Sequence, residues 1–530
     1  MEKRTLLAVA LAIIVLVLYH YLVPTPKPPQ IEKEKKEEVV KEKETPSKDK
    51  APVKEKKPVS LGVVEEKLIH IETELYKAVL TNKGAAIKSW ELKKYTDNDK
   101  KPVQLLRTED PSVLPLSIFP GPSLEQGEGI LKGNYKVDKE KVILSKDMEK
   151  ETISFFYQDR TGVSVKKTLA FYSKDYRVDI KIETEGINSY TLSLGQDFGI
   201  FKKDEGYGHV GPVTRVNSDN ITNKPEKIKE PLIYKGSIAW TAMEDKYFTA
   251  AVAPVSKVDE AVVNRIGDSA TTGLTTSLGV SEFILYAGPK EYDRLKTLKV
   301  GLEDIIDYGW FPLGSSGNKV LALPFFRLLK LFYNFLKNYG LAIILLTVLV
   351  RIVFIPLTNK SQKSMKAMQS LAPKVNEIKE KYKKDPQRMN KEVMELYKKH
   401  KINPVGGCLP MILQLPVFIA LYNVLMYAIE LRGAPFFLWV TDLSAPDTLF
   451  GHVGGFSLGG PLPYLMGITM FVQQKMTPSS LDPMQSKMML FMPVVLTFMF
   501  LSFPSGLVLY WLVNNVLSIA QQYYINKKTA

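Results

Sequence analysis

The chain has 530 residues, 45% of them hydrophobic and 24% charged, with a formal net charge of +15. Its single cysteine, Cys408, excludes an intrachain disulfide and a cysteine zinc site, and the five histidines form no metal-binding pair. No nucleophile–base pair stands out either, so the sequence predicts no enzyme, no catalytic residue, no metal and no cofactor. Because the lysines flank apolar segments, membrane topology and anionic membrane lipids explain the charge better than a specific nucleic acid.

The N-terminus, residues 1–23, combines the cations of MEKR with about 19 mostly apolar residues. A cleaved signal peptide is the alternative, but the apolar run is too long and no A-x-A site precedes Pro24. We therefore expect an uncleaved transmembrane anchor. Residues 24–58, rich in Lys, Glu and Pro, cannot bury a core and are predicted to be a disordered linker.

Residues 59–298 alternate apolar and polar positions, as in YRVDIKIETEG and SEFILYAG, with turn residues between the segments. This pattern predicts an all-β sandwich domain, for which binding or scaffolding is the default role. Residues 299–338 then become helical and amphipathic. Trp310 and Phe311 favour a helix at the membrane interface there, followed by a second amphipathic helix, PFFRLLKLFYNFLKNYG.

The remaining residues, 339–530, contain five hydrophobic segments and predict a five-span core. These segments lie at 339–357, 408–429, 461–476, 488–503 and 505–524. With the anchor they make a polytopic α-helical membrane protein of six spans. Residues 359–403 hold thirteen Lys or Arg against five Asp or Glu, so this loop belongs in the cytoplasm. Both termini are then cytoplasmic, and residues 24–338 lie on the opposite side of the membrane.

The same basic loop has a helical period of its own. Apolar residues recur at three- and four-residue steps on both sides of Asp385-Pro386, a favourable N-cap and first helical residue. We therefore predict a cytoplasmic helical hairpin over 361–401. A solvated basic loop without such structure is the alternative.

Arg351 lies inside the span at 339–357, six residues or roughly 9 Å from Leu357. A buried helix of a soluble protein and snorkelling to the interface are the alternative explanations, but the interface is far to reach and an arginine in hydrocarbon costs at least about 2.5 kcal/mol. Spans two to six offer no acidic partner. Other spans carry polar residues. Taken one at a time, these are best explained by hydrogen bonds between helices, but as a set they indicate a wet cavity. The predicted wet cavity, a candidate site for a substrate that arrives from outside, comprises Arg351, Thr347, Gln414, Gln473, Tyr510, Trp511, Asn514 and Asn515.

Four long stretches resemble the YidC/Oxa/Albino family of membrane protein insertases, and the resemblance runs the full length. They are TVLVRIVFIPLTNKSQKSMKAMQSLAPK, INPVGGCLPMILQLPVFIALYNVL, LRGAPFFLWVTDLSAPD and FMPVVLTFMFLSFPSGLVLYWLVNN. The resemblance implies a Gram-negative member of the bacterial inner membrane, with a hydrophilic groove that carries Arg351. It also implies nascent membrane proteins as clients, and contact with the ribosome and the Sec translocon, including SecD and SecF. Trp511 departs from some relatives, which have a second tyrosine there.

Two other classes of protein compete with this interpretation. A transporter or channel could use Arg351 as an anion site, but the chain shows no internal repeat. An intramembrane protease could use Ser505, but no histidine or lysine base is evident.

Overall fold

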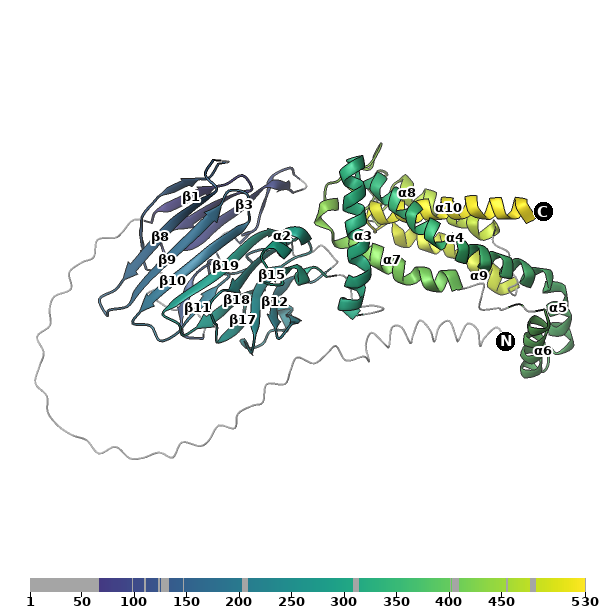
Figure 1. Ribbon diagram of the computed structural model, residues 1–530, viewed down its shortest axis with the longest axis horizontal. Coiled ribbons are helices and arrows are strands. Elements are labelled where there is room, and N and C mark those ends of the chain that lie inside the picture. Colours follow the sequence, from purple (N-terminus) through teal and green to yellow (C-terminus); the bar gives the residue numbers. More distant parts are fainter. Residues whose placement is uncertain are drawn as a thin grey trace, which may run out of the picture. The chain divides into compact units, whose positions relative to one another are not determined.

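The computed structural model describes residues 66–529 except 98, 109–110, 123, 125–132, 146, 203–207, 308–313, 401, 403–408, 454–455 and 477–482. The predicted anchor (1–23) and linker (24–58), together with Trp310 and Phe311, lie outside the described residues. The described chain is strand-rich at first and helical afterwards (Figure 1).

Three sheets make up the strand-rich part. The first has the order β4-β3-β2-β1-β7, from β1 (Leu68–Glu72), β2 (Tyr76–Thr81), β3 (Ala86–Thr96), β4 (Pro102–Gln104) and β7 (Lys141–Ile143). The nine-stranded sheet has the order β13-β12-β15-β16-β19-β10-β9-β8-β6. Its strands are β6 (Lys136–Val137), β8 (Lys150–Gln158), β9 (Ser164–Tyr172), β10 (Arg177–Glu185), β12 (Gly211–Val216), β13 (Asp219–Thr222), β15 (Ile238–Glu244), β16 (Phe248–Pro254) and β19 (Val280–Pro289). The third sheet, β14-β17-β18-β11-β5, contains β5 (Ile118–Pro120), β11 (Tyr190–Ser193), β14 (Leu232–Lys235), β17 (Glu260–Ile266) and β18 (Ser269–Thr276).

Buried and less buried side chains alternate along strands such as β10, which gives a sheet an apolar face that packs in a sandwich. In β10, Val178, Ile180 and Ile182 are buried while the residues between them are less so. One hydrophobic core joins residues from all three sheets, and Trp90 of β3 donates from Nε1 to the Ala287 carbonyl of β19 at 3.1 Å. The predicted all-β sandwich is thereby confirmed, with one parallel pair, β1 with β7, among otherwise antiparallel neighbours.

The helical elements follow in chain order. They are η1 (Pro225–Lys227), α2 (Tyr292–Thr297), η2 (Leu302–Ile305), α3 (Gly314–Leu336), α4 (Tyr339–Ser370), α5 (Ala372–Lys381), α6 (Pro386–Lys399), α7 (Leu409–Tyr427), η4 (Ile429–Leu431), α8 (Pro461–Met476), α9 (Pro483–Phe500) and α10 (Ser505–Thr529), with a small hairpin of β20 (His452–Val453) and β21 (Phe456–Ser457) before α8.

Within the described residues, α4 is the one helix long and apolar enough to cross a membrane by length and composition. Shorter apolar stretches lie at Gln414–Tyr427 in α7 and Met489–Phe500 in α9. The six-span topology therefore stays a prediction.

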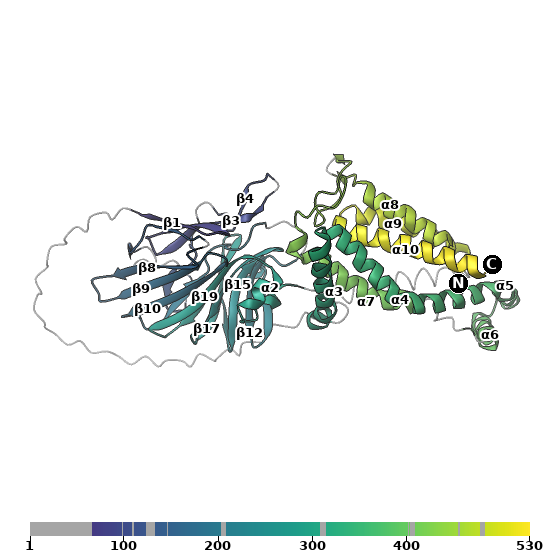
Figure 2. The same ribbon diagram turned by 45° about the horizontal axis from the view of Figure 1, so that its top comes forward.

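The helices pack as a bundle with one crossing element. α10 lies against α8, α4 and α7, and α9 packs on α8. α3 contacts both α4 and α7, and Figures 1 and 2 show it running across the direction of α4, α8 and α10. It buries Ala322, Phe326 and Leu329 but leaves Val320 and Phe335 exposed. An apolar stripe on each side suits a helix that lies at a membrane interface.

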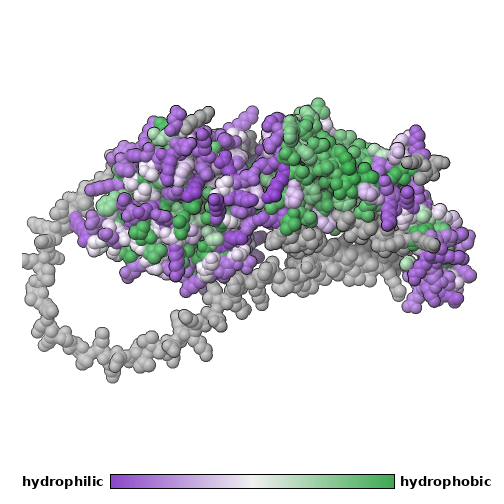
Figure 3. Space-filling view, in the orientation of Figure 1, coloured by the Kyte–Doolittle hydropathy of each residue, from purple (hydrophilic) through white to green (hydrophobic). Residues whose placement is uncertain are grey.

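The basic loop forms helices with the predicted break before Pro386, but its first part is divided at Leu371 between α4 and α5. α4 continues past the apolar segment to Ser370, and the chain turns at Leu371 because Pro373, the second residue of α5, has no N–H to donate to the carbonyl four residues earlier. Asp385 caps α6 by accepting from the Arg388 backbone N–H at 3.1 Å, with Pro386 as the first helical residue. Leu371, Val375 and Tyr397 form the small core between the two helices. Hydrophilic side chains dominate the end of the helical part that holds α5 and α6 (Figure 3).

Candidate functional site

Arg351 lies deep in α4. Asn338 caps this helix by accepting from the Leu341 backbone N–H at 3.1 Å, and twelve residues, or about 18 Å, separate Tyr339 from Arg351. The Arg351 side chain is half-buried. Its Nε atom is buried without a hydrogen-bond partner, and no carboxylate forms an ion pair with Arg351 in the described part of the chain. A cation this deep and this poorly satisfied is costly unless something else meets it.

Tyr510 of α10 is the neighbour that interacts electrostatically with Arg351. Its ring is almost fully buried, yet its hydroxyl also lacks a hydrogen-bond partner. Gln414 of α7 lies beside that hydroxyl without making a well-formed hydrogen bond. We call Arg351, Gln414 and Tyr510 the arginine cluster. Three helices far apart in sequence thus bring donors and acceptors to one place and leave them only partly satisfied.

The Trp511 side chain does not join the arginine cluster. Its indole makes edge contacts with Phe418, at 4.8 Å between ring centroids, and with Phe500, at 5.0 Å. The Tyr510 ring also lies 6.3 Å from Phe418. Trp511 therefore packs the aromatic wall between α7, α9 and α10, next to the arginine cluster.

Two further predicted groove residues have internal partners. Thr347 is 1% exposed, and its hydroxyl donates to the Ile343 carbonyl of its own helix at 2.7 Å. Asn515 is buried and donates to the Thr469 hydroxyl at 3.3 Å, which joins α10 to α8. The side chains of Gln473 and Asn514 are half-buried.

One polar group near the end of α10 was absent from the predicted site. Gln521 donates from Nε2 to the Thr358 hydroxyl and to Asn359 Oδ1, both at 2.8 Å, and its Oε1 is buried without a partner. The available signal was its position on the same face of the last span as Tyr510. Its partners on α4, Thr358 and Asn359, come directly after the apolar segment. Polar residues are common at that position, so the sequence did not indicate that these two belong to a site.

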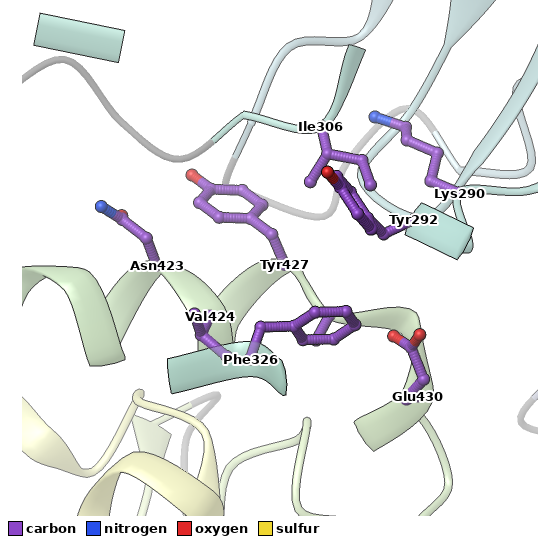
Figure 4. Close-up of a pocket in the computed structure, with 9 residues that line it drawn as sticks. Lys290, Tyr292, Ile306, Phe326, Asn423, Val424, Tyr427 and Glu430 are labelled. Atoms are coloured by element: carbon purple, nitrogen blue, oxygen red, sulfur yellow. The ribbon is translucent and has the colours of Figure 1, made fainter. Parts of the chain in front are cut away.

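The structure also contains a small pocket of about 10 Å³ (Figure 4), and no residue of the arginine cluster lines it. Phe326 and Tyr427 line it, together with Glu430, whose carboxylate lies 3.7 Å from Lys330 Nζ. Burial raises the pKa of Glu430 to about 7. The pocket holds no more than a water molecule, so it is too small for a client segment.

Ser505, the candidate for an intramembrane protease, begins α10 and is buried. Its hydroxyl donates to the Ala445 carbonyl at 2.7 Å, and its backbone N–H donates to the same oxygen at 2.8 Å. These bonds fix the first residue of α10, and the Ser505 hydroxyl is already engaged as a donor. Among the described residues, no group of three or more His, Cys, Asp or Glu side chains could hold a metal ion.

Comparison with known proteins identifies the family. Residues 331–530 match the model of the 60Kd inner membrane protein, and residues 68–328 match that of the YidC periplasmic domain. The membrane protein insertase YidC of Syntrophus aciditrophicus is 42% identical over 88% of this chain and 86% of its own length. That of Pelobacter propionicus is 40% identical over 99% of both chains. A crystal structure of an active YidC insertase covers 87% of this chain and 93% of its own at 22% identity and a TM-score of 0.37. The two family models and the two sequence relatives show that the chain belongs to the YidC family of membrane protein insertases, a family of inner-membrane transport proteins and not of enzymes.

Proposed function

We propose that this chain inserts nascent membrane proteins by offering the arginine cluster to the polar end of each arriving segment. The observation that carries the proposal is Arg351, a deep cation whose Nε is buried without a partner. A structural arginine would be expected to bond to neighbouring helices, as Asn515 does. An arginine without an internal partner is available to a group that arrives from outside.

The apolar part of the client docks on side chains that the bundle leaves exposed. α9 presents Phe491, Val495 and Phe498, each more than half exposed, on the helix that follows α8. α7 presents Leu415 one residue after Gln414. An arriving segment can therefore bury its apolar face on α7 and α9 while its short polar tail meets Arg351.

No energy source beyond the client is required. Charge-assisted hydrogen bonds hold the tail for the time that it spends in the membrane. Short spans lower the barrier further, because the 16 residues of α8 cover only about 24 Å of a hydrocarbon core that is about 30 Å thick. The client then leaves sideways into the lipid, where burial of its own apolar surface favours insertion.

The partners and topology belong to the same proposal. Six spans, cytoplasmic termini and a periplasmic segment over 24–338 place the basic helices α5 and α6 on the cytoplasmic side, where clients and ribosomes arrive. The Sec translocon, including SecD and SecF, would act beside the core for clients with large outer domains. Membrane lipids surround the spans.

Photo-crosslinking from Ile355 tests the proposal. Ile355 lies one helical turn after Arg351 on the same face of α4 and is 39% exposed. A photoreactive residue there should trap stalled nascent chains. Val353, also on α4 but on another face, is the matched control and should trap lipid. An anion channel, the competing function, would leave nascent chains untrapped at both positions.

A further inference from the structure

Exposed hydrophobic side chains gather on the segment between η4 and α8. We call residues 433–460 the outer loop. Leu438 is 88% exposed, and four other large apolar residues of this loop are each more than half exposed. They are Phe437, Leu449, Phe450 and Val453.

Hydrogen bonds and packing hold the described part of the outer loop, which leaves out residues 454–455, in a defined shape. The Phe436 backbone N–H donates to the Val440 carbonyl at 2.9 Å and closes a turn with Leu438 at its tip. The Phe436 ring packs on Gly340 so closely that a Cβ there would lie 2.0 Å from the ring. Asp447 accepts from Trp439 Nε1 at 3.1 Å and from the Leu462 backbone N–H at 3.0 Å. The exposed side chains are therefore displayed by a braced loop.

The backbone of Leu438 supports a role for its side chain. Its φ is +57°, in the left-handed region that favours glycine and disfavours a residue with a Cβ. The turn itself would be easier to form with glycine. A leucine in this conformation, with most of its surface exposed, is best explained by what its side chain contacts.

The loop also keeps its charges away from its apolar surface. Residues 433–460 contain two acidic residues and no Lys or Arg. Asp447 is 6% exposed, and Asp442 accepts from the backbone N–H and the hydroxyl of Ser444, both at 2.8 Å. His452 is the remaining titratable side chain of the loop. A loop made for bulk water would not be expected to turn its carboxylates inward and Leu438 and Leu449 outward.

The length of α8 indicates which apolar phase covers this surface. The outer loop leads directly into α8, whose length of about 24 Å falls roughly 6 Å short of the hydrocarbon core. Tyr464, Leu465 and Ile468 continue the exposed apolar surface down this helix. Phe335 and Leu336, at the end of α3, are exposed as well. Hydrophobic side chains cover much of the visible helical part (Figure 3).

We propose that the outer loop inserts into the outer leaflet of the bilayer, with Leu438 and Val453 at the boundary between headgroups and acyl chains. The ligand is phospholipid, and the loop completes the distance that α8 is too short to span. It thereby fixes the depth of α8 from the periplasmic side. This inference rests on the proposed membrane spans, and its test separates the two.

The single native cysteine makes site-specific labelling direct. In a Cys408→Ser background, an environment-sensitive fluorophore is attached to a cysteine at one of four positions: 438, 453, 468 or 255. Ile468, in the middle of α8, is the control for lipid exposure. Val255, an exposed apolar residue of the β domain, is the control for water. The full-length protein is reconstituted in phosphatidylcholine vesicles, with or without bromine on the upper part of the acyl chains.

The expected result is that probes at 438 and 453 are quenched by the brominated lipid at least about twofold more than the probe at 255, and are protected from aqueous iodide. Iodide quenching at 438 and 453 equal to that at 255, with 468 still in lipid, would overturn the outer-loop proposal alone. Protection that appears only after purified translocon is added would also overturn it, because the partner would then be protein. An aqueous 468 would overturn the proposed span of α8, and this proposal with it.

Discussion

Replacing Arg351 separates a cation that meets clients from a cation that braces the bundle. Arg351→Ala removes the charge, and Arg351→Lys keeps the charge but cannot reproduce the planar guanidinium fork. If Arg351 acts through its charge, the lysine variant should keep much of the activity. If it is a brace that bonds to neighbouring helices at two points, lysine should fail as alanine does.

The structure gives the expected size of the effect. A cation and a carboxylate 4 Å apart attract by about 4 kcal/mol at an effective dielectric constant of 20, and a hydrogen bond to a charged group contributes about 1.5–3 kcal/mol net of solvation. At about 1.4 kcal/mol per factor of ten, Arg351→Ala should slow insertion of clients with acidic tails by roughly 10- to 100-fold. Clients with neutral tails should slow only about twofold, because docking on α7 and α9 remains.

The same structure predicts no loss of stability. Arg351 Nε is buried without a hydrogen-bond partner, and no ion pair holds the side chain in the described part of the chain. Truncating an unsatisfied buried group removes a destabilising term of about 1–3 kcal/mol. The melting temperature of Arg351→Ala should therefore equal or exceed that of the parent protein.

The assay uses pairs of clients that differ only in tail charge, inserted into vesicles that contain each variant. Arg327→Ala is the matched control, since Arg327 is an exposed cation on α3, outside the arginine cluster. Melting curves for all four proteins run alongside. Equal losses for acidic and neutral tails in both Arg351 variants, together with lowered melting temperatures, would refute the charge mechanism in favour of a brace.

Three further predictions test other parts of the molecule. Deleting residues 372–399 should reduce insertion and crosslinking at position 355, and unchanged crosslinking would reject a recruiting role for α5 and α6. Gly467→Ala places a Cβ 2.0 Å from Thr497 Oγ1, which should cost about 1–3 kcal/mol and lower the melting temperature, whereas Val472→Ala on the exposed face should not. Burial lowers the pKa of His209 to about 4, so its contribution to the free energy of unfolding is present above pH 6.5 and is lost as pH falls towards 4. This pH-dependent contribution is at most about 3 kcal/mol, and it should be absent when unfolding of His209→Gln is measured across the same pH range.

Elements whose structure depends on residues near in sequence were predictable from sequence patterns. Alternation in segments such as YRVDIKIETEG predicted β10 and its buried face, because the two-residue period of a strand is visible in sequence. Asp385-Pro386 predicted the start of α6 because an N-cap is a short-range hydrogen bond. The end of α4 was harder to predict. Its apolar segment ends near Leu357, but polar residues carry the same helix on to Ser370.

The candidate site was predictable as a set of residue types and not as a set of contacts. Arg351 stood out because a charge in an apolar run is rare. Asn514 and Asn515 are adjacent and chemically identical, yet Asn515 turns towards α8 and bonds to Thr469. Which of two neighbouring amides faces another helix depends on how α10 is rotated in the bundle. That rotation is set by packing among helices far apart in sequence, which no local pattern encodes.

Polar side chains in these helices therefore fall into two groups, those that hydrogen-bond within the bundle and those that do not. Asn515 and Gln522 donate to α8, the latter to the Met476 carbonyl at 2.6 Å, so their polarity is used within the bundle. Arg351 Nε and the Tyr510 hydroxyl are buried without such partners. In a low-dielectric setting, satisfied groups stabilise a fixed packing, while unsatisfied ones favour any state in which a partner arrives. Asn515 and Gln522 thus hold neighbouring helices together, whereas under the proposed function Arg351 would gain a hydrogen-bond partner only when a client enters.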